Sequence, residues 1–148
     1  MKITLVKLGM RPQVDKFQYV LNETAEDASI LAKEILINAV KAMNINDAIS
    51  ILEGEDNAAT IYLKKNTSES LYTKFKPIVK SSIDKVNLTK YWQTLTLRYN
   101  SIPLAKEVNT DLADYVTNQT IEGLFILIAT EEKNIRNNPK ARVSEILQ

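Results

Sequence analysis

The chain has 148 residues, of which 45% are hydrophobic and 25% are charged, and its net charge is +1. This is typical of one globular domain with its own core, and the near-neutral charge gives no reason to expect nucleic acid as a partner. The chain contains no cysteine and no histidine, which excludes disulfides, thiol nucleophiles, Cys or His metal sites and Ser-His-Asp catalysis within it.

Membrane segments and cofactor motifs are not evident in the sequence. The longest apolar run is "LFILIA" at 124–129, whereas a spanning helix needs roughly 20 residues. The opening "MKITLVKLGM" lacks the pattern of a secretory signal. Neither a calcium-loop spacing nor a glycine-rich phosphate loop occurs, so we expect no cofactor and no metal.

The apolar residues recur at intervals of three and four, and glycine and proline are scarce. This pattern predicts an all-α fold, a single-domain bundle of about six to eight helices over residues 1–148. Pro12 is expected near the start of a first helix. Thr24 and Asp27 resemble a capping box that opens a second helix, which we expect to be largely buried because apolar residues cover most of its surface.

The stretch "ILEGEDNAATIYLKKNT" at 51–67 is predicted to connect helices. Asn46 is expected to cap the short helix before it, and Gly54 to end that helix in the left-handed conformation. Asp56 or Asn57 then caps a helix that begins "AATIYL". The amides at such a helix start can bind an anion, but the local acids would repel one, so a connector is favoured.

A long helix is predicted to begin at Thr67 or Ser68, and Pro77 within it predicts a kink. The following "LTKYWQTLTLRYN" at 88–100 places apolar residues on one helical face. A strand at 94–99 is the alternative; helix is preferred because no partner strand is evident.

Two helices are predicted before the C-terminal segment. Thr110 is expected to cap a short helix at 111–116, and residues 117–136 are expected to form the long central helix. This helix is apolar nearly all round, as in the middle of a bundle or at a subunit interface. Asn138 and Pro139 predict the start of a final short helix, "KARVSEIL".

Glu132 is the strongest candidate for chemistry, because at helical spacing it lies on the apolar stripe between Ile128 and Ile135. An unpaired carboxylate there would have a raised pKa and could act as a general acid, with Glu131 at the edge of the stripe. The preferred interpretation is an ion pair between Glu132 and Arg136, four residues on. A carboxylate-bridged metal pair would need histidines, which are missing.

Aromatic residues offer a second candidate site. Trp92, Phe125 and Tyr62 could line a cavity for an apolar small molecule or lipid. Such residues belong more often to a core, with their polar atoms reaching a partner, and that interpretation is preferred.

The charges are grouped along the chain. Residues 64–90 carry seven lysines and two acids, a net of +5, while residues 107–132 carry six acids and no base, a net of −6. Attraction between the two blocks within one chain is the preferred interpretation. The alternative is self-association, in which the basic block of one copy meets the acidic block of another.

Three segments resemble a bacterial family known as domain of unknown function 4197. They are "LGMRPQVDKFQYVLNETAEDA", "AVKAMNINDAISILEGEDNAATIYLKKNTSESLYTKFKPIVKSSIDKVNL" and "DLADYVTNQTIEGLFILIATEEKNIRNNPKAR". Thr130 stands where another acid is expected. The resemblance implies an exported protein, periplasmic or envelope-associated, and suggests that a leader and a preceding segment are missing here. It supplies no catalytic residue.

The function is therefore unknown at this stage, and three hypotheses remain. The first is a noncatalytic helical interaction module of the bacterial cell envelope, which binds a protein or itself. The second is a carrier of an apolar small molecule or lipid between its helices. The third, least favoured, is an acid/base enzyme that uses Glu132.

Overall fold

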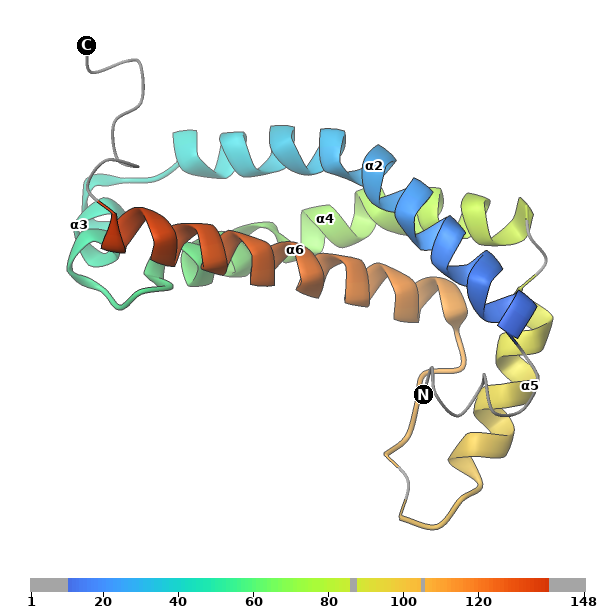
Figure 1. Cartoon of the computed structure of the whole chain (residues 1–148). Helices are drawn as coiled ribbons and strands as arrows, with labels where there is room; N and C mark the ends of the chain where they lie inside the picture. Colours follow the sequence, from blue (N-terminus) through green and yellow to red (C-terminus); the bar gives the residue numbers. More distant parts are fainter. Residues whose placement is uncertain (1–10, 86–87, 105, 139–148) are drawn as a thin grey trace.

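The computed structural model describes residues 11–85, 88–104 and 106–138. These residues form helices and contain no strand (Figure 1). The helices are α2 (Arg11–Lys41), α3 (Ile45–Glu53), α4 (Ala58–Lys85), α5 (Thr89–Asn100) and α6 (Leu112–Asn137). The predicted all-α class is confirmed, but five described helices do not confirm the predicted six to eight. The final helix predicted after Pro139 lies outside the described residues.

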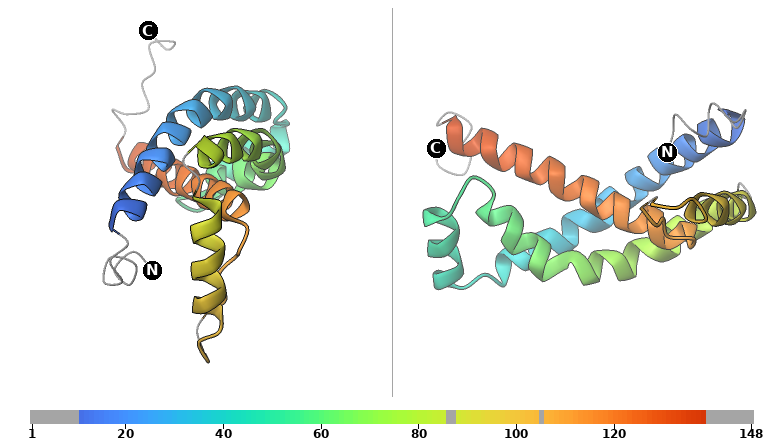
Figure 2. Two further views of the ribbon diagram at one scale, coloured as in Figure 1. Left: turned by 90° about the vertical axis from the view of Figure 1, so that its right-hand side faces the viewer. Right: turned by 90° about the horizontal axis from the view of Figure 1, so that it is seen from below.

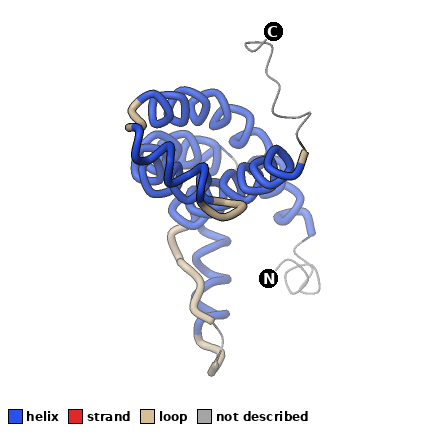
Figure 3. Tube along the Cα trace, turned by 90° about the vertical axis from the view of Figure 1, so that its left-hand side faces the viewer, coloured by secondary structure: helices blue, strands red, loops and turns tan. Residues whose placement is uncertain are grey.

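Three long helices make up the body of the molecule. Helix α4 packs against both α2 and α6, so it is the central helix of the three. The short α3 crosses one end of the body, and α5 projects from the other end (Figures 1 and 2). Figure 3 shows the loop after α5 extending with it away from the long helices. The two ends of the molecule are therefore built differently.

The buried side chains form two clusters. The central core joins α2, α4 and α6 and contains Ala32, Leu71, Phe75, Ile121 and Phe125. The α5 core lies between the end of α4, α5 and the start of α6, and it contains Val79, Ile83, Leu88, Trp92, Leu112 and Val116. The indole N–H of Trp92 donates to the carbonyl of Asn109 at 3.0 Å, which fastens α5 to the residues before α6. The helix predicted at 88–100 is thus confirmed as α5, and the strand alternative is wrong.

Two predicted helix starts are wrong because each lies inside a longer helix. Helix α2 continues through Thr24, and α4 begins at Ala58 and continues through Thr67 and Ser68. The hydroxyls of Thr67 and Ser68 donate to carbonyls four residues earlier, at 2.7 and 2.6 Å. They are satisfied within the helix and do not cap one. Helix α4 also contains Pro77, and the predicted kink there is not confirmed.

The predicted caps near α3 and α6 also need correction. Asn44, not Asn46, caps α3, in a reciprocal capping box with Asp47. Asp111, not Thr110, caps α6 by accepting the N–H of Asp114 at 3.0 Å. The two helices predicted at 111–136 are one helix, since no residue between them breaks the turn.

Gly54 ends α3 for a different reason than predicted. Its φ of −79° and ψ of 178° are extended values, which most residues can adopt. A Cβ atom at this position would lie only 2.5 Å from the Cβ of Ala58. Gly54 is therefore required for the close approach of α3 to the start of α4, and not for a left-handed turn.

Burial of α2 and α6 is less complete than their apolar content predicts. On α2, Ile30 is 75% exposed, and Ile37 and Val40 are also exposed; on α6, Ile126 and Leu127 are exposed. The reason is the position of α4 between them, which leaves each outer helix one main neighbour. The molecule consequently displays more apolar surface than the sequence pattern suggests.

Within residues 11–85, 88–104 and 106–138, no single helix is both long and apolar enough to cross a bilayer. The segments Ile30–Lys41 and Ile45–Glu53, bent by 105°, reach the required length and composition only as a pair.

Candidate functional site

Glu132 lies on α6 but caps the start of α4. Its Oε1 accepts the N–H of Ala59 at 2.9 Å, and its Oε2 accepts the N–H of Thr60 at 2.8 Å. The hydroxyl of Thr60 adds a third bond to Oε2 at 2.7 Å. The first-turn amides of a helix have no partner within the helix, and their dipoles favour an anion. The carboxylate that caps this helix start is thus supplied by the chain itself, which agrees with the predicted connector.

Arg136 extends the same cluster to α3. Its Nη2 lies 2.8 Å from Oε1 of Glu132, which confirms the predicted ion pair, and it also donates to the carbonyl of Ile51 at 2.8 Å. That carbonyl belongs to the last turn of α3, where a cation is favoured. The cluster therefore joins the end of α3, the start of α4 and α6.

The protonation of Glu132 follows from these bonds. Its side chain is only 9% exposed. Burial raises the pKa of Glu132, but the hydrogen bonds from Thr60, Ala59 and Arg136 outweigh burial, and the pKa is lowered. A general acid needs the opposite shift, so the geometry does not favour acid/base chemistry at Glu132.

The lowered pKa predicts how stability depends on pH. Because the pKa of Glu132 is lower in the folded chain than its ordinary value of 4.5, its contribution is complete above that value and is lost as the pH falls through the folded pKa. Urea unfolding of the wild type and of Glu132→Gln should differ by a constant free energy near neutral pH. This difference should shrink below pH 4.5. A difference that persists unchanged into acid would contradict the assignment.

A groove of about 660 Å³ lies beside this cluster. We call it the α3–α6 groove, and its lining residues are Leu52, Ala59, Leu127, Ile128, Glu131, Glu132, Ile135 and Arg136. Leu52 is 78% exposed and Leu127 is 66% exposed, while Ile135 is about half exposed. Glu131 is exposed at the rim. The structure thus places all three predicted polar residues, Glu131, Glu132 and Arg136, at one groove. Glu132 and Arg136 bond to each other and to the backbone of the chain, whereas Glu131 is exposed to solvent.

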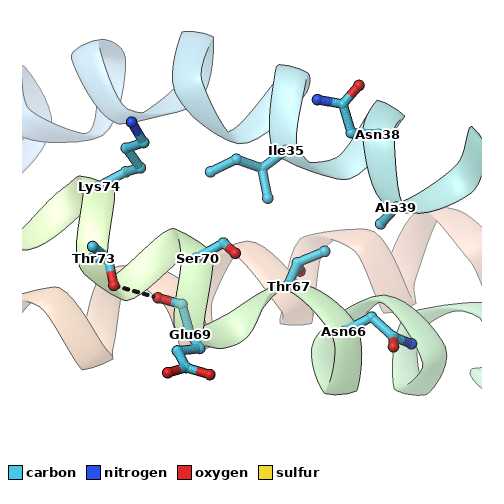
Figure 4. A pocket seen from close by; sticks show the side chains of 9 residues that line it. All are labelled: Ile35, Asn38, Ala39, Asn66, Thr67, Glu69, Ser70, Thr73 and Lys74. Atoms are coloured by element: carbon cyan, nitrogen blue, oxygen red, sulfur yellow. Dashed lines mark hydrogen bonds between the residues drawn. The ribbon is translucent and has the colours of Figure 1, made fainter. Parts of the chain in front are cut away.

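A second groove, of about 570 Å³, separates α2 from α4 (Figure 4). Figure 4 shows Lys74 rising from α4 toward α2 and Ile35 of α2 reaching into the space between the helices. The polar groups of its α4 wall are partly used within the helix: the Thr73 hydroxyl donates to the carbonyl of Glu69 at 2.9 Å, and the Asn66 amide donates to that of Tyr62 at 2.8 Å. The α2–α4 groove is therefore a weaker candidate for a binding site.

Sequence reasoning missed a second polar cluster, which links α4 to the start of α6. The Tyr72 hydroxyl donates to Oδ1 of Asp114, and the Lys76 ammonium lies 2.6 Å from the Tyr72 oxygen and 3.4 Å from Oδ1. The bond from Tyr72 is the largest cause that lowers the pKa of Asp114, and the bond to Tyr72 likewise raises the pKa of Lys76. The four-residue spacing of Tyr72 and Lys76 indicates that they are adjacent on a helix. Their partner Asp114 lies 38 or more residues away in the sequence, so local spacing does not reveal it.

The two charge blocks meet within the chain at this cluster and at one more contact. The Lys64 ammonium lies 2.6 Å from Oε2 of Glu122, and Lys76 pairs with Asp114. These contacts join α4 to α6, as the intramolecular interpretation predicted. They leave the self-association hypothesis untested.

The three aromatic candidates do not form one site. Phe125 is buried in the central core, Trp92 is buried in the α5 core, and Tyr62 is partly buried on α4. The Trp92 ring instead stacks obliquely on Tyr115, with ring centroids 4.9 Å apart. Neither of the two grooves is lined by Trp92, Phe125 or Tyr62.

Metal binding finds no support in the part of the chain that the structure describes. Within it, no group of three or more Asp or Glu side chains is arranged to hold a metal ion. The fold and site thus define an all-α protein with a structural charge cluster beside an apolar groove.

The chain belongs to the family DUF4197, described as a protein of unknown function, whose model matches residues 1–148. No curated protein and no solved structure matches the chain. The resemblance inferred from the sequence is therefore confirmed, and the function of the chain stays unknown.

Proposed function

We propose that this chain is a noncatalytic interaction module of the bacterial cell envelope, and that it binds protein through the α3–α6 groove. The observation that carries the proposal is the exposure of Leu52 and Leu127 on that groove. Exposed apolar side chains gathered in a concave, polar-rimmed site are typical of binding surfaces.

The charges of the site favour binding over chemistry. The oxygens of Glu132 accept five hydrogen bonds from Ala59, Thr60 and Arg136, so the donors of the chain itself saturate this carboxylate. The groove therefore offers shape and apolar contacts. The envelope location rests on the family resemblance alone.

The carrier hypothesis has less support. It requires a cavity at Trp92 and Phe125, and these side chains are packed in two separate cores. An apolar ligand would have to use the α3–α6 groove, which is open at its rim, where Glu131 is exposed.

Site-specific photo-crosslinking in cells tests the proposal. A photoreactive amino acid in place of Glu131 is introduced into the protein expressed in its host, and the envelope fraction is analysed after illumination. We expect a protein adduct from position 131 that disappears with the second change Leu127→Asp. Position 126 is the matched control, because Ile126 is exposed on α6 but does not line the groove.

Three outcomes would contradict the proposal. One is no adduct from position 131, and another is an equal adduct from position 126. The third is an adduct with lipid alone, which would favour the carrier hypothesis.

A further inference from the structure

The end of α5 and the loop after it carry three exposed apolar residues, Leu97 of α5 and Ile102 and Leu104 of the loop, which we define as the apolar tip. All three side chains are exposed, and Leu104 is completely so. Leu104 also has a φ of 65°, a left-handed conformation that is unfavourable for a residue with a branched side chain. Leu104 thus combines an unfavourable backbone conformation with an apolar side chain that is exposed to solvent. No contact among the residues that the structure describes accounts for either feature.

The tip is held in place at its base. The Asn100 amide donates to the carbonyl of Val108 at 2.7 Å, and the N–H of Val108 donates back to the Asn100 oxygen at 2.8 Å. These two hydrogen bonds join the residue before the loop to a residue near its end. The bond from Trp92 to the Asn109 carbonyl fixes the next residue. The tip is therefore preorganised, which lowers the entropy lost on binding.

The α3–α6 groove is lined by residues of α3, the start of α4 and the second half of α6, and these segments lie at the opposite end of the molecule from α5 and the loop after it (Figures 1 and 2). The groove is a concave surface with exposed apolar side chains, and the tip is a projection with exposed apolar side chains. Because they lie at opposite ends of the molecule, the tip of a chain cannot reach its own groove. It can reach the groove of a second copy.

The charges around the two structures are complementary. Glu131 lies at the rim of the groove, and Glu53 and Glu55 follow Leu52 in the chain; none of these three forms an ion pair with another described residue. Arg98 and Lys106 flank the tip in sequence, with Glu107 as the one acid beside them. A two-fold contact between grooves would bring like charges together, whereas tip in groove pairs opposite charges.

We propose that the tip of one copy docks in the α3–α6 groove of a second copy, head to tail. The inference rests on the proposed function, since it names a second copy of this chain as the protein that the groove binds. Each copy carries one tip and one groove, so the contact is heterologous and repeats into a ring or an open chain.

Sedimentation velocity of the purified chain over a range of concentrations and salt tests this inference. We expect the average mass of the wild type to rise with concentration and to fall with added salt. Leu104→Asp removes the tip and Leu127→Asp blocks the groove. Each should weaken association by about tenfold or more, because one apolar side chain is lost from the contact and a charge is buried. Ile126→Asp is the control, an exposed apolar residue outside both structures.

Mixing the two variants gives the sharpest result. Leu104→Asp retains an intact groove, and Leu127→Asp retains an intact tip, so an equimolar mixture should form a dimer with one copy of each and nothing larger. Circular dichroism checks that both variants fold, which we expect because both positions are exposed. A contact between like surfaces would not be restored by mixing.

A wild type that stays monomeric at every concentration, or a mixture that stays monomeric, would overturn the head-to-tail contact. The proposed function is judged separately by the crosslink from position 131. If that crosslink joins a different protein while the pure chain is monomeric, the proposed function stands and this inference fails. If both experiments are negative, both proposals fail.

Discussion

Replacing Glu132 with glutamine is expected to lower the free energy of unfolding by about 2–4 kcal/mol. The carboxylate accepts two backbone N–H groups and one hydroxyl at the start of α4, and it is the counter-ion of Arg136. Glutamine offers one oxygen, and its NH₂ group would face donors that now bind the second oxygen. Urea unfolding followed by circular dichroism at neutral pH measures the change.

Glu131→Gln is the matched control for this variant. Glu131 precedes Glu132 on α6, but its side chain is exposed, so its replacement should change stability by no more than about 0.5 kcal/mol. The variant Arg136→Met and the double variant complete a mutant cycle. We expect the double variant to lose less stability than the sum of the single losses. Equal losses for Glu131→Gln and Glu132→Gln would show that the cap does not stabilise the fold.

Replacing Phe75 with alanine is expected to have the largest effect on stability, about 3–5 kcal/mol. Phe75 is only 1% exposed and lies in the central core, where α4 meets α2 and α6. Removing its ring leaves a cavity that three helices cannot close at once, because each is held by its other contacts. Thermal and urea unfolding both report this loss.

Ile126→Ala provides the comparison, because Ile126 is a large apolar residue of α6 that is exposed. Its replacement should change the free energy of unfolding by no more than about 0.5 kcal/mol. If Phe75→Ala were as mild as Ile126→Ala, the central core would have been assigned wrongly.

Helix class and local pairing were predictable from the sequence. The three- and four-residue spacing of apolar side chains, together with few glycines and prolines, indicates helices without knowledge of their neighbours. The Glu132–Arg136 pair was predictable for the same reason, since residues four apart on a helix are adjacent. The charge blocks indicated that 64–90 and 107–132 attract each other, and two ion pairs between α4 and α6 agree with this.

Helix ends were less predictable, because a capping residue acts only where the chain leaves the helix. Thr67 has the chemistry of a cap, yet it lies buried inside α4 and donates to its own helix. The start of α4 at Ala58 depends instead on Glu132, which is 72 residues away from Thr60. The local sequence around Ala58 therefore gives no indication that Glu132 caps α4.

The sequence alone determined that the chain is helical, which family it belongs to and which residues neighbour each other along a helix, because these properties depend on local spacing. The tertiary structure decided that Glu132 caps α4, that Gly54 permits a close approach, and that Leu52 and Leu127 remain exposed at a groove. These properties depend on which helices lie side by side. A hydrogen bond between two helices, or the burial of a side chain, requires a neighbouring helix that the local sequence does not specify.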